Sequence, residues 1–539
     1  MGFGDELKSA VENGASRGIL DFSIELEREY EARTSVAARK EKGQFFTPPP
    51  VCRFMAGLFN RDFPDAFRLL DPGAGVGSLS AAVCERISSL RSPRRLQIHL
   101  FENDTTVLPY LERNLEHCCE SLKQAGHNLT YRIHEKDFIL DAAEPLFSPP
   151  SLFADPDRLN DFDGVIMNPP YFKLSKDSSY ARIMDDVVHG QPNIYAFFLA
   201  AGAEMLRPGG QLIAITPRSF CNGLYFRDFR RWFLQRMALN HIHLFESRTG
   251  TFRDVLQESL ITASHRLGEP SASVTITTSF AANPGKGSCR TLPTSLVVDD
   301  SCGQLTVRIP ASEEDSEIAR IVECWPARFS SLGLRVSTGP VVMFRATEFL
   351  ANQPHDEGTV PLLSVFNVKP FETVWPVPHK KQPPSFKVCA ESLRLLLPAR
   401  NYVLLRRFSA KEERRRLTAS CLLSTSLNQP FVALENHLNY VYHAERELAV
   451  DEVYGLAALF NSALFDRYFR TFSGNTQVNA TELRMMKFPD LSRIASIGNR
   501  IRALRVFDPD AVEVIVLAEL GIHERLRDHL LEGTLFSQI

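Results

Sequence analysis

Between about residues 67 and 265 the chain alternates short apolar runs with longer stretches in which apolar residues recur at helical spacing. Short apolar runs bounded by turn residues predict buried strands, whereas apolar residues three and four positions apart predict helices, here at 78–89 and 194–206. Strands that alternate with helices predict a mostly parallel sheet covered on both faces. Seven strands are expected, at 67–71, 96–102, 130–137, 163–168, 211–216, 240–246 and 256–264.

The pattern changes beyond about residue 300. Prolines between Pro340 and Pro398 interrupt the short apolar runs there, which predicts an irregular α+β region because proline cannot continue a helix or a central strand. A helical pattern returns at 451–470, and a helix-rich tail follows residue 510. We therefore predict three parts: a helical segment with an α/β domain over 1–300, an α+β domain over 301–500 and a helical tail over 501–539.

A glycine-rich turn follows the first predicted strand, within the segment LLDPGAGVGSLSAA at 69–82. The strand ends at Asp71, after which Gly73, Gly75 and Gly77 allow the backbone to turn tightly and to approach a ligand before a helix begins. The spacing GxGxG differs from the GxGxxG of dinucleotide-binding proteins. This turn alone therefore favours a nucleotide-type ligand only slightly over a plain tight turn.

Carboxylates also end the next two predicted strands, at Glu102 and Asp137. The carboxyl ends of parallel strands meet at one edge of a sheet, where such sheets bind ligands. A carboxylate at the end of the second strand can accept hydrogen bonds from two ribose hydroxyls, although a single acid could equally be an exposed residue at a strand end. Three acids at successive strand ends, including Asp71, predict a ligand site at this edge.

The strand at 163–168 runs into Asn168-Pro169-Pro170-Tyr171. Two prolines fix the backbone just beyond the strand, so the Asn168 side chain and the Pro169 carbonyl become rigid acceptors for both hydrogens of a planar amino group. Holding both hydrogens favours a pyramidal nitrogen and frees its lone pair for attack. The Tyr171 ring offers a flat face on which the ring that bears the amino group can stack. A chance turn is the weaker interpretation of this tetrapeptide.

Taken together, these segments resemble S-adenosylmethionine-dependent amino-methyltransferases of DNA. GQFFTP, DPGAGVG, FEND, KDF, NPPY, the NIYAFFLAAGAEMLRPGG stretch and TPRSF follow one another as motifs X and I to VI do in that group. Their order resembles the gamma class of adenine-N6 enzymes from restriction-modification systems, of the TaqI and PstI type. The resemblance is specific over 40–265. It implies a seven-stranded, mostly parallel, Rossmann-like methyltransferase domain with S-adenosylmethionine as its cofactor, no metal, and a C-terminal α+β target-recognition domain.

The resemblance also implies a role for residues of each motif. Along the cofactor, from its methionine end through its ribose to its adenine, it implies Phe45, Phe46, Thr47, Asp71, Gly73, Gly75, Glu102, Asp137 and Phe138. For catalysis it implies Asn168, Pro169, Pro170, Tyr171 and Phe252, the last facing the motif IV tyrosine across a flipped base. A phenylalanine of the core is the alternative interpretation of Phe252.

The net charge of −3 for 539 residues does not by itself indicate a protein that binds nucleic acid. The charge is unevenly distributed, however. The segment 380–416 carries eleven lysines and arginines and three glutamates, a charge of +8, which leaves −11 for the rest of the chain. A basic run is often a solvated helix face, but beside an amino-methyltransferase site contact with phosphates is the better interpretation.

The candidate DNA-binding residues follow from this segment and from a polar loop near 473–479. Arginines and lysines would contact phosphates, whereas asparagine and glutamine side chains would reach base edges or, alternatively, brace the helix that follows. The candidates are Arg406, Arg407, Lys411, Arg414, Arg415, Arg416, Asn475, Gln477 and Asn479.

Other chemistry is less well supported. The ten cysteines are too sparse for a disulfide framework, and the N-terminus lacks the apolar stretch of a signal peptide, so a soluble, cytoplasmic protein without a membrane segment is expected. His241 and His243 alternate on one strand and could form a metal pair, but no third ligand is in view, and strand packing is favoured.

We therefore predict a monomeric DNA adenine-N6 methyltransferase that acts on duplex DNA and modifies a site also read by a separately encoded restriction endonuclease. Neither a metal nor a covalent enzyme intermediate is needed for this reaction. Three alternatives stay open: a methyltransferase acting on protein glutamine or RNA, a cytosine-N4 DNA methyltransferase, and a DNA-binding specificity subunit without catalysis.

Overall fold

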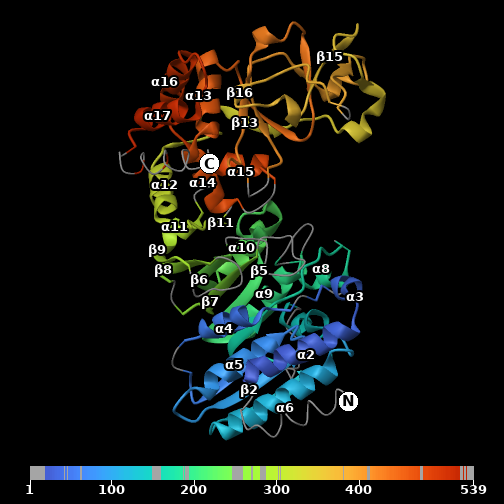
Figure 1. The fold of residues 1–539 in the computed structure, drawn as a ribbon, viewed down its shortest axis with the longest axis vertical. Helices are drawn as coiled ribbons and strands as arrows, with labels where there is room; N and C mark the ends of the chain where they lie inside the picture. Colours follow the sequence, from blue (N-terminus) through green and yellow to red (C-terminus); the bar gives the residue numbers. More distant parts are fainter. Residues whose placement is uncertain are drawn as a thin grey trace, which may run out of the picture. The chain divides into compact units, whose positions relative to one another are not determined.

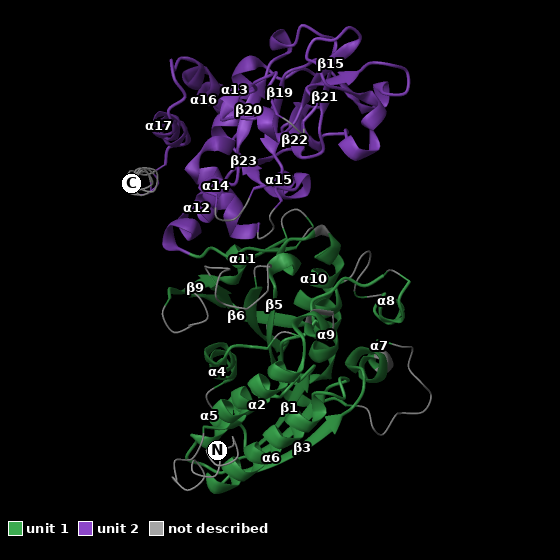
Figure 2. Cartoon of the chain, turned by 45° about the vertical axis from the view of Figure 1, so that its right-hand side comes forward, with its two compact units in different colours: residues 1–311 green, residues 312–539 purple. Residues whose placement is uncertain are grey.

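The computed structural model describes residues 18–530 apart from short gaps. These gaps are 42, 45, 61–62, 148–158, 176, 186, 188–192, 246–258, 269–270, 280–286, 301–302, 304, 380–381, 410–412, 474–476, 523–525 and 527–529. The chain divides into two compact units, Met1–Ala311 and Ser312–Ile539 (Figure 2). The predicted boundary at 300 lies close to this division, whereas the one predicted at 500 lies inside helix α16 (Leu491–Arg502).

The first unit is built on one large mixed sheet (Figure 1). Its order among the described residues is β3-β2-β1-β4-β5-β7-β6-β8-β9, and β7 runs antiparallel between β5 and β6. The strands are β1 (Ala66–Pro72), β2 (Arg95–Phe101), β3 (Asn128–His134), β4 (Phe162–Met167), β5 (Leu206–Pro217), β6 (Met237–Phe245), β7 (Ser259–Arg266), β8 (Ser273–Ser279) and β9 (Cys289–Pro293).

All seven predicted strands are present, but the sheet in the described residues has nine strands rather than seven. The additional strands β8 and β9 extend the sheet beyond β6. Sequence patterning missed β8 because the first six of its seven residues, SVTITTS, alternate between exposed or partly exposed and buried positions, and five of the seven are serine or threonine. Such a strand at the side of a sheet lacks the continuous apolar run of a central parallel strand.

Helices cover both faces of the sheet, and the two faces are set by the alternation of side chains along each strand. Leu69 packs with α2, α4, α5 and α6, whereas the next residue, Leu70, packs with α9 on the opposite face. Figure 1 shows α2, α5 and α6 lying side by side. The helices of this unit are α2 (Ile19–Arg33), α3 (Val36–Glu41), α4 (Pro49–Gly57), α5 (Ser78–Ser88), α6 (Leu108–Gln124), α7 (Glu144–Phe147), α8 (Ser179–Ile183), α9 (Ile194–Met205), α10 (Arg227–Leu234) and α11 (Thr294–Val297).

His241 and His243 take part in strand packing. Thr277 Oγ1 on β8 lies 2.8 Å from His241 Nε2 and 2.8 Å from His243 Nδ1, and Ser279 Oγ lies 3.0 Å from His243 Nε2. Burial lowers the pKa of both histidines to about 4. Two neutral rings that bridge to hydroxyls of the neighbouring strand favour the packing interpretation over a metal pair.

The second unit combines two five-stranded sheets with helices in its described residues. One sheet has the order β13-β22-β19-β20-β16 and the other β14-β17-β15-β21-β18. Its strands are β13 (Leu334–Thr338), β14 (Leu350–Ala351), β15 (Thr359–Leu363), β16 (Phe371–Glu372), β17 (Ser385–Lys387), β18 (Leu396–Pro398), β19 (Tyr402–Arg406), β20 (Ala419–Leu422), β21 (Phe431–Leu434) and β22 (Leu438–His443). Its helices are α12 (Glu313–Glu323), α13 (Val450–Asn461), α14 (Ala463–Phe472), α15 (Ala480–Met485), α16 and α17 (Pro509–Leu520).

Helix α16 packs closely on α13, and α17 contacts both of them. An ideal Cβ on Gly455 would lie 1.9 Å from the Ile494 carbonyl oxygen, so only glycine permits this approach of the two backbones.

In the parts of the chain that the structure describes, no helix combines the length and the apolar character needed to cross a membrane.

Candidate cofactor and active site

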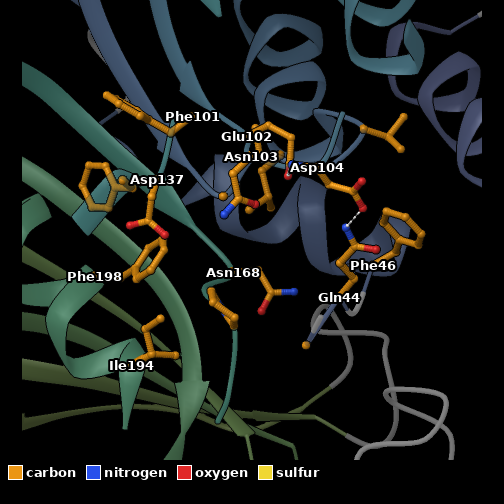
Figure 3. A pocket seen from close by; sticks show the side chains of 18 of the residues that line it. Gln44, Phe46, Phe101, Glu102, Asn103, Asp104, Asp137, Asn168, Ile194 and Phe198 are labelled. Carbon is orange, nitrogen blue, oxygen red and sulfur yellow. Dashed lines mark hydrogen bonds between the residues drawn. The ribbon is translucent and has the colours of Figure 1, made fainter. Parts of the chain in front are cut away.

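A cavity of about 560 Å³ lies where the sequence predicted a ligand site, at the carboxyl ends of the parallel strands. Figure 3 shows Asn168 between two groups of side chains, Asp137, Phe198 and Ile194 on one side and Gln44 and Phe46 on the other. Predicted site residues that line this cavity are Phe46, Thr47, Gly73, Gly75, Glu102, Asp137, Phe138, Asn168 and Pro170.

The glycine-rich turn after β1 forms one part of the lining. Gly73 and Gly75 have φ angles of +74° and +57°, and ideal Cβ atoms there would lie 3.5 Å from the Phe198 ring and 3.6 Å from the Phe46 ring. Both rings line the cavity, so side chains at these glycines would take up space within it. At Gly77 a Cβ would lie 2.8 Å from Leu111, which explains the third glycine by packing between α5 and α6.

Glu102 follows β2 and joins the turn to the next loop. One carboxylate oxygen accepts a hydrogen bond from the Gly75 amide at 2.8 Å, and the other accepts one from the Asp104 amide at 2.8 Å. Glu102 is 7% exposed, and burial raises its pKa. The carboxylate therefore lies at the cavity with its orientation fixed by two backbone donors.

Asp71 lies beneath the turn and does not belong to the cavity lining. Its carboxylate accepts a hydrogen bond from the Ser80 hydroxyl at 2.6 Å. The side chain is 1% exposed, and burial raises its pKa to about 7. In this position Asp71 holds the start of α5, and its contact with the cofactor stays a prediction.

Asp137 and Phe138 stand at the other end of the cavity. One Asp137 oxygen accepts hydrogen bonds from the Ile139 and Leu140 amides at 2.9 Å each, and the other accepts one from the Tyr180 hydroxyl at 2.7 Å. The Phe138 ring lies 5.1 Å from that of Phe198. Tyr180 and Phe198 were not predicted, because they lie on α8 and α9, where no motif singled out individual residues.

Asn168 connects the motif after β4 with the segment before α4. Its amide nitrogen donates to Thr47 Oγ1 at 3.0 Å, and its amide oxygen accepts from the Tyr171 hydroxyl at 2.6 Å. The same hydroxyl lies 2.9 Å from the carbonyl oxygen of Ile215 on β5. The carboxamide of Asn168 is thus held between two hydroxyl groups. Pro169 is buried.

The segment before α4 also holds residues that the sequence did not single out. The Gln44 amide nitrogen donates to Asp104 at 2.8 Å, and an ideal Cβ on Gly43 would lie 3.3 Å from Pro170. Gly43 and Gln44 both line the cavity, and so does Phe172, whose ring is exposed. Gln44 and Asp104 lie within the motif segments GQFFTP and FEND, so their place in these motifs could have identified them as site residues.

Four predicted site residues lie outside the described residues. They are Phe45, Phe252, Lys411 and Asn475.

In the second unit, several candidate DNA-binding residues contact their own chain. Arg406 donates twice to the Val368 carbonyl, at 3.0 and 2.6 Å, and Arg407 donates to Gln477 Oε1 at 3.3 Å. Asn479 precedes α15, and the Glu482 carboxylate accepts hydrogen bonds from its backbone amide at 2.9 Å and its side-chain amide at 3.4 Å, which fits the bracing role that the sequence left open. Beside Arg407 the Phe408 ring is 43% exposed, a feature that a basic run does not predict.

Arg416 does not face solvent. It is 1% exposed, its guanidinium lies 3.3 Å from Ser409 Oγ and 5.4 Å from the centre of the Phe469 ring, and its amide donates to Asp466 at 2.6 Å. A phosphate contact by Arg416 was therefore wrongly predicted, because this guanidinium is enclosed by the fold. Arg415 lies 3.9 Å from the buried Glu513, whereas Arg414 is exposed.

Comparison with known proteins yields consistent matches. Residues 86–252 match the family model of the Eco57I restriction-modification methylase. The chain is 36% identical to the type II methyltransferase M.BsuBI of Bacillus subtilis over 467 residues, covering 85% of this chain and 90% of that protein. It is 33% identical to the type II methyltransferase M.PstI of Providencia stuartii over 469 residues, covering 86% and 90%.

Among solved structures, that of the type IIL restriction-modification enzyme MmeI in complex with DNA covers 99% of this chain and 75% of its own, at 11% identity and a TM-score of 0.48. The sequence identity to M.BsuBI and M.PstI extends over both compact units. On that identity and on the order of its motifs, the chain belongs to the type II methyltransferases of restriction-modification systems, in their gamma class.

Proposed function

We propose that the protein transfers a methyl group from S-adenosylmethionine to the N6 amino group of adenine in duplex DNA, as the modification enzyme of a restriction-modification system. The observation that carries this proposal is the oriented carboxamide of Asn168 beside the cavity. The amide nitrogen donates one of its two hydrogens to Thr47, and the amide oxygen at the other end of the carboxamide would accept from an amino group.

The cavity suits S-adenosylmethionine in charge and shape. Four of its lining residues are acidic, Glu27, Glu102, Asp104 and Asp137, against one lysine, Lys136. That excess of negative charge fits a ligand with a sulfonium and an ammonium group. The aromatic rings at the Phe138 end offer a slot for adenine, and the Glu102 carboxylate can accept hydrogen bonds from ribose hydroxyls.

When bound, the cofactor supplies an electrophilic methyl group. Asn168 Oδ1 and the Pro169 carbonyl oxygen would each accept one hydrogen of the target amino group, which orients its nitrogen toward that methyl group. The carbonyl of Asn168 has two lone pairs, so the hydrogen bond from Tyr171 leaves one for the substrate. Tyr171 and Thr47 thus act by positioning Asn168. The proton that the amino nitrogen loses after methylation leaves to solvent.

Adenine N6 in a duplex lies inside the base stack, so the base has to be flipped out before transfer. The exposed basic residues of the segment 380–416, such as Arg414, would contribute phosphate contacts that hold the duplex. Specificity for adenine over cytosine would follow from asparagine, rather than serine, at position 168.

Incubation with radiolabelled S-adenosylmethionine and, separately, DNA, RNA and protein tests this function. We expect label in DNA alone, recovered after digestion to nucleosides as N6-methyl-2′-deoxyadenosine. Recovery as N4-methyl-2′-deoxycytidine would assign the cytosine reaction, and label in RNA or in protein would assign an RNA or a protein glutamine methyltransferase. Absence of label from every substrate, with DNA bound, would contradict catalysis altogether.

Arg414 provides a test of the DNA contact. Replacing Arg414 by glutamate is expected to weaken binding to duplex DNA and to lower the slope of log affinity against log salt by about one phosphate contact or slightly more. Fluorescence anisotropy over a range of salt concentrations measures both quantities. Arg505→Glu is the matched control, because Arg505 is also exposed but lies outside the basic segment. An identical salt slope in both variants would make Arg414 part of a solvated surface.

A further inference from the structure

Glu27 lies on helix α2, ahead of every motif that the sequence singles out, yet it lines the cofactor cavity. It is 8% exposed and accepts a very short hydrogen bond from the hydroxyl of Ser78, the first residue of α5. Ser78 and Leu79 line the cavity at the same place. A carboxyl group is thus held between the buried face of helix α2 and the ligand site.

Helix capping alone does not account for this carboxyl group. Carboxylates are stabilised at helix N-termini, and α5 begins at Ser78. Asp71 already serves that end of α5 through the Ser80 hydroxyl. A second buried acid adds an unfavourable desolvation cost unless a cation compensates it.

The charges around Glu27 do not compensate it. Its pKa is raised to about 8, chiefly by burial and to a smaller extent by the neighbouring Glu31, and Ser78 and Arg28 only partly oppose this. Burial raises the pKa of the Cys52 thiol on α4, and the charges of Glu27 and Asp71 raise it as well. Such a group gains most from a ligand that brings a positive charge.

We propose that Glu27 binds the α-ammonium group in the methionine part of the cofactor, an inference that rests on the use of S-adenosylmethionine in the proposed function. An ammonium group offers three donors, and its hydrogen bonds to a carboxylate are charge-assisted. The positive end of α5 beside Glu27 suits the carboxylate of the same amino acid. Glu27 and the N-terminal end of α5 would then recognise the two charges of a zwitterion.

The rest of α2 holds Glu27 on the Phe46 side of the cavity. One turn further along the helix, the Tyr30 hydroxyl donates to Gln44 Oε1 at 3.1 Å, and its ring meets that of Phe46 edge-on with centres 5.9 Å apart. Helix α2 is thereby fixed to the segment that carries Thr47, which contacts Asn168. The resemblance places the methionine end of the cofactor in this region, away from the aromatic slot around Phe138.

The test measures whether Glu27 and the amino group act on each other. Calorimetry on the full chain gives the affinities of S-adenosylhomocysteine and of its deaminated analogue, in which hydrogen replaces the amino group. We expect the wild type to prefer S-adenosylhomocysteine by about 10- to 100-fold, and Glu27→Gln to lose that preference. Glu31→Gln, on the same helix but outside the cavity lining, should keep it.

Several outcomes would overturn the inference. If the wild type shows no preference for S-adenosylhomocysteine, the inference fails even if the variant does not fold. If the preference persists in Glu27→Gln, another residue binds the ammonium group. Equal weakening of both ligands together with a lower melting temperature would make Glu27 a structural acid. The proposed function fails separately, if the wild type binds neither S-adenosylmethionine nor S-adenosylhomocysteine.

Discussion

Replacing Asn168 by alanine is expected to abolish methyl transfer to DNA, with a fall in kcat of at least about 1000-fold, while the affinity for S-adenosylmethionine stays near that of the wild type. The variant removes the acceptor proposed to hold one amino hydrogen, an interaction that matters only when the nitrogen attacks. Single-turnover transfer to DNA and calorimetric cofactor binding measure the two quantities. Unchanged turnover would refute the assignment of the active site.

Tyr171→Phe is a graded companion to this variant. It removes the hydroxyl that lies 2.6 Å from Asn168 and 2.9 Å from the Ile215 carbonyl, but it keeps the aromatic ring. A positioning role predicts a fall in kcat of about 10-fold with DNA affinity retained. A fall as large as that of Asn168→Ala would instead mean that the hydroxyl itself takes part in the reaction.

Much of the first unit could be predicted from the sequence because buried parallel strands leave continuous apolar runs. The run ending at Met167 is an example, since both faces of β4 are covered. The same topology brings the carboxyl ends of β1, β2 and β4 together, so Glu102 and Asn168 could be assigned to one site without knowledge of their contacts. The strand β8 escaped prediction because its polar, half-exposed pattern is not typical of a central strand.

The burial of a side chain could not be predicted where it depends on contacts with residues far away in the sequence. Arg414 and Arg416 are two residues apart in one basic run, yet one is exposed and the other enclosed. What encloses Arg416 is Asp466 and Phe469, about 50 residues further along the chain. Glu27 presents the same difficulty, because its place at the cavity depends on how α2 packs against α5.

Glu102→Ala is expected to weaken the binding of S-adenosylmethionine by at least about 100-fold. The change removes an acceptor proposed for two ribose hydroxyls, and it also leaves the Gly75 and Asp104 amides without the carboxylate that both now contact at 2.8 Å. The variant would therefore weaken the lining of the cavity and the binding of the cofactor at the same time. Calorimetry measures the affinity, and thermal unfolding reports whether the fold is kept.

The kinetics of this variant separate binding from chemistry. If Glu102 acts only through the cofactor, KM for S-adenosylmethionine rises while kcat at saturation stays within a few fold of the wild type, because Asn168 is untouched. Glu135→Ala is the control, since it removes an exposed carboxylate from the loop after β3 that does not line the cavity. A KM equal to that of the control would place the ribose elsewhere, and the carboxylate would then serve only to join the glycine turn to the loop after β2.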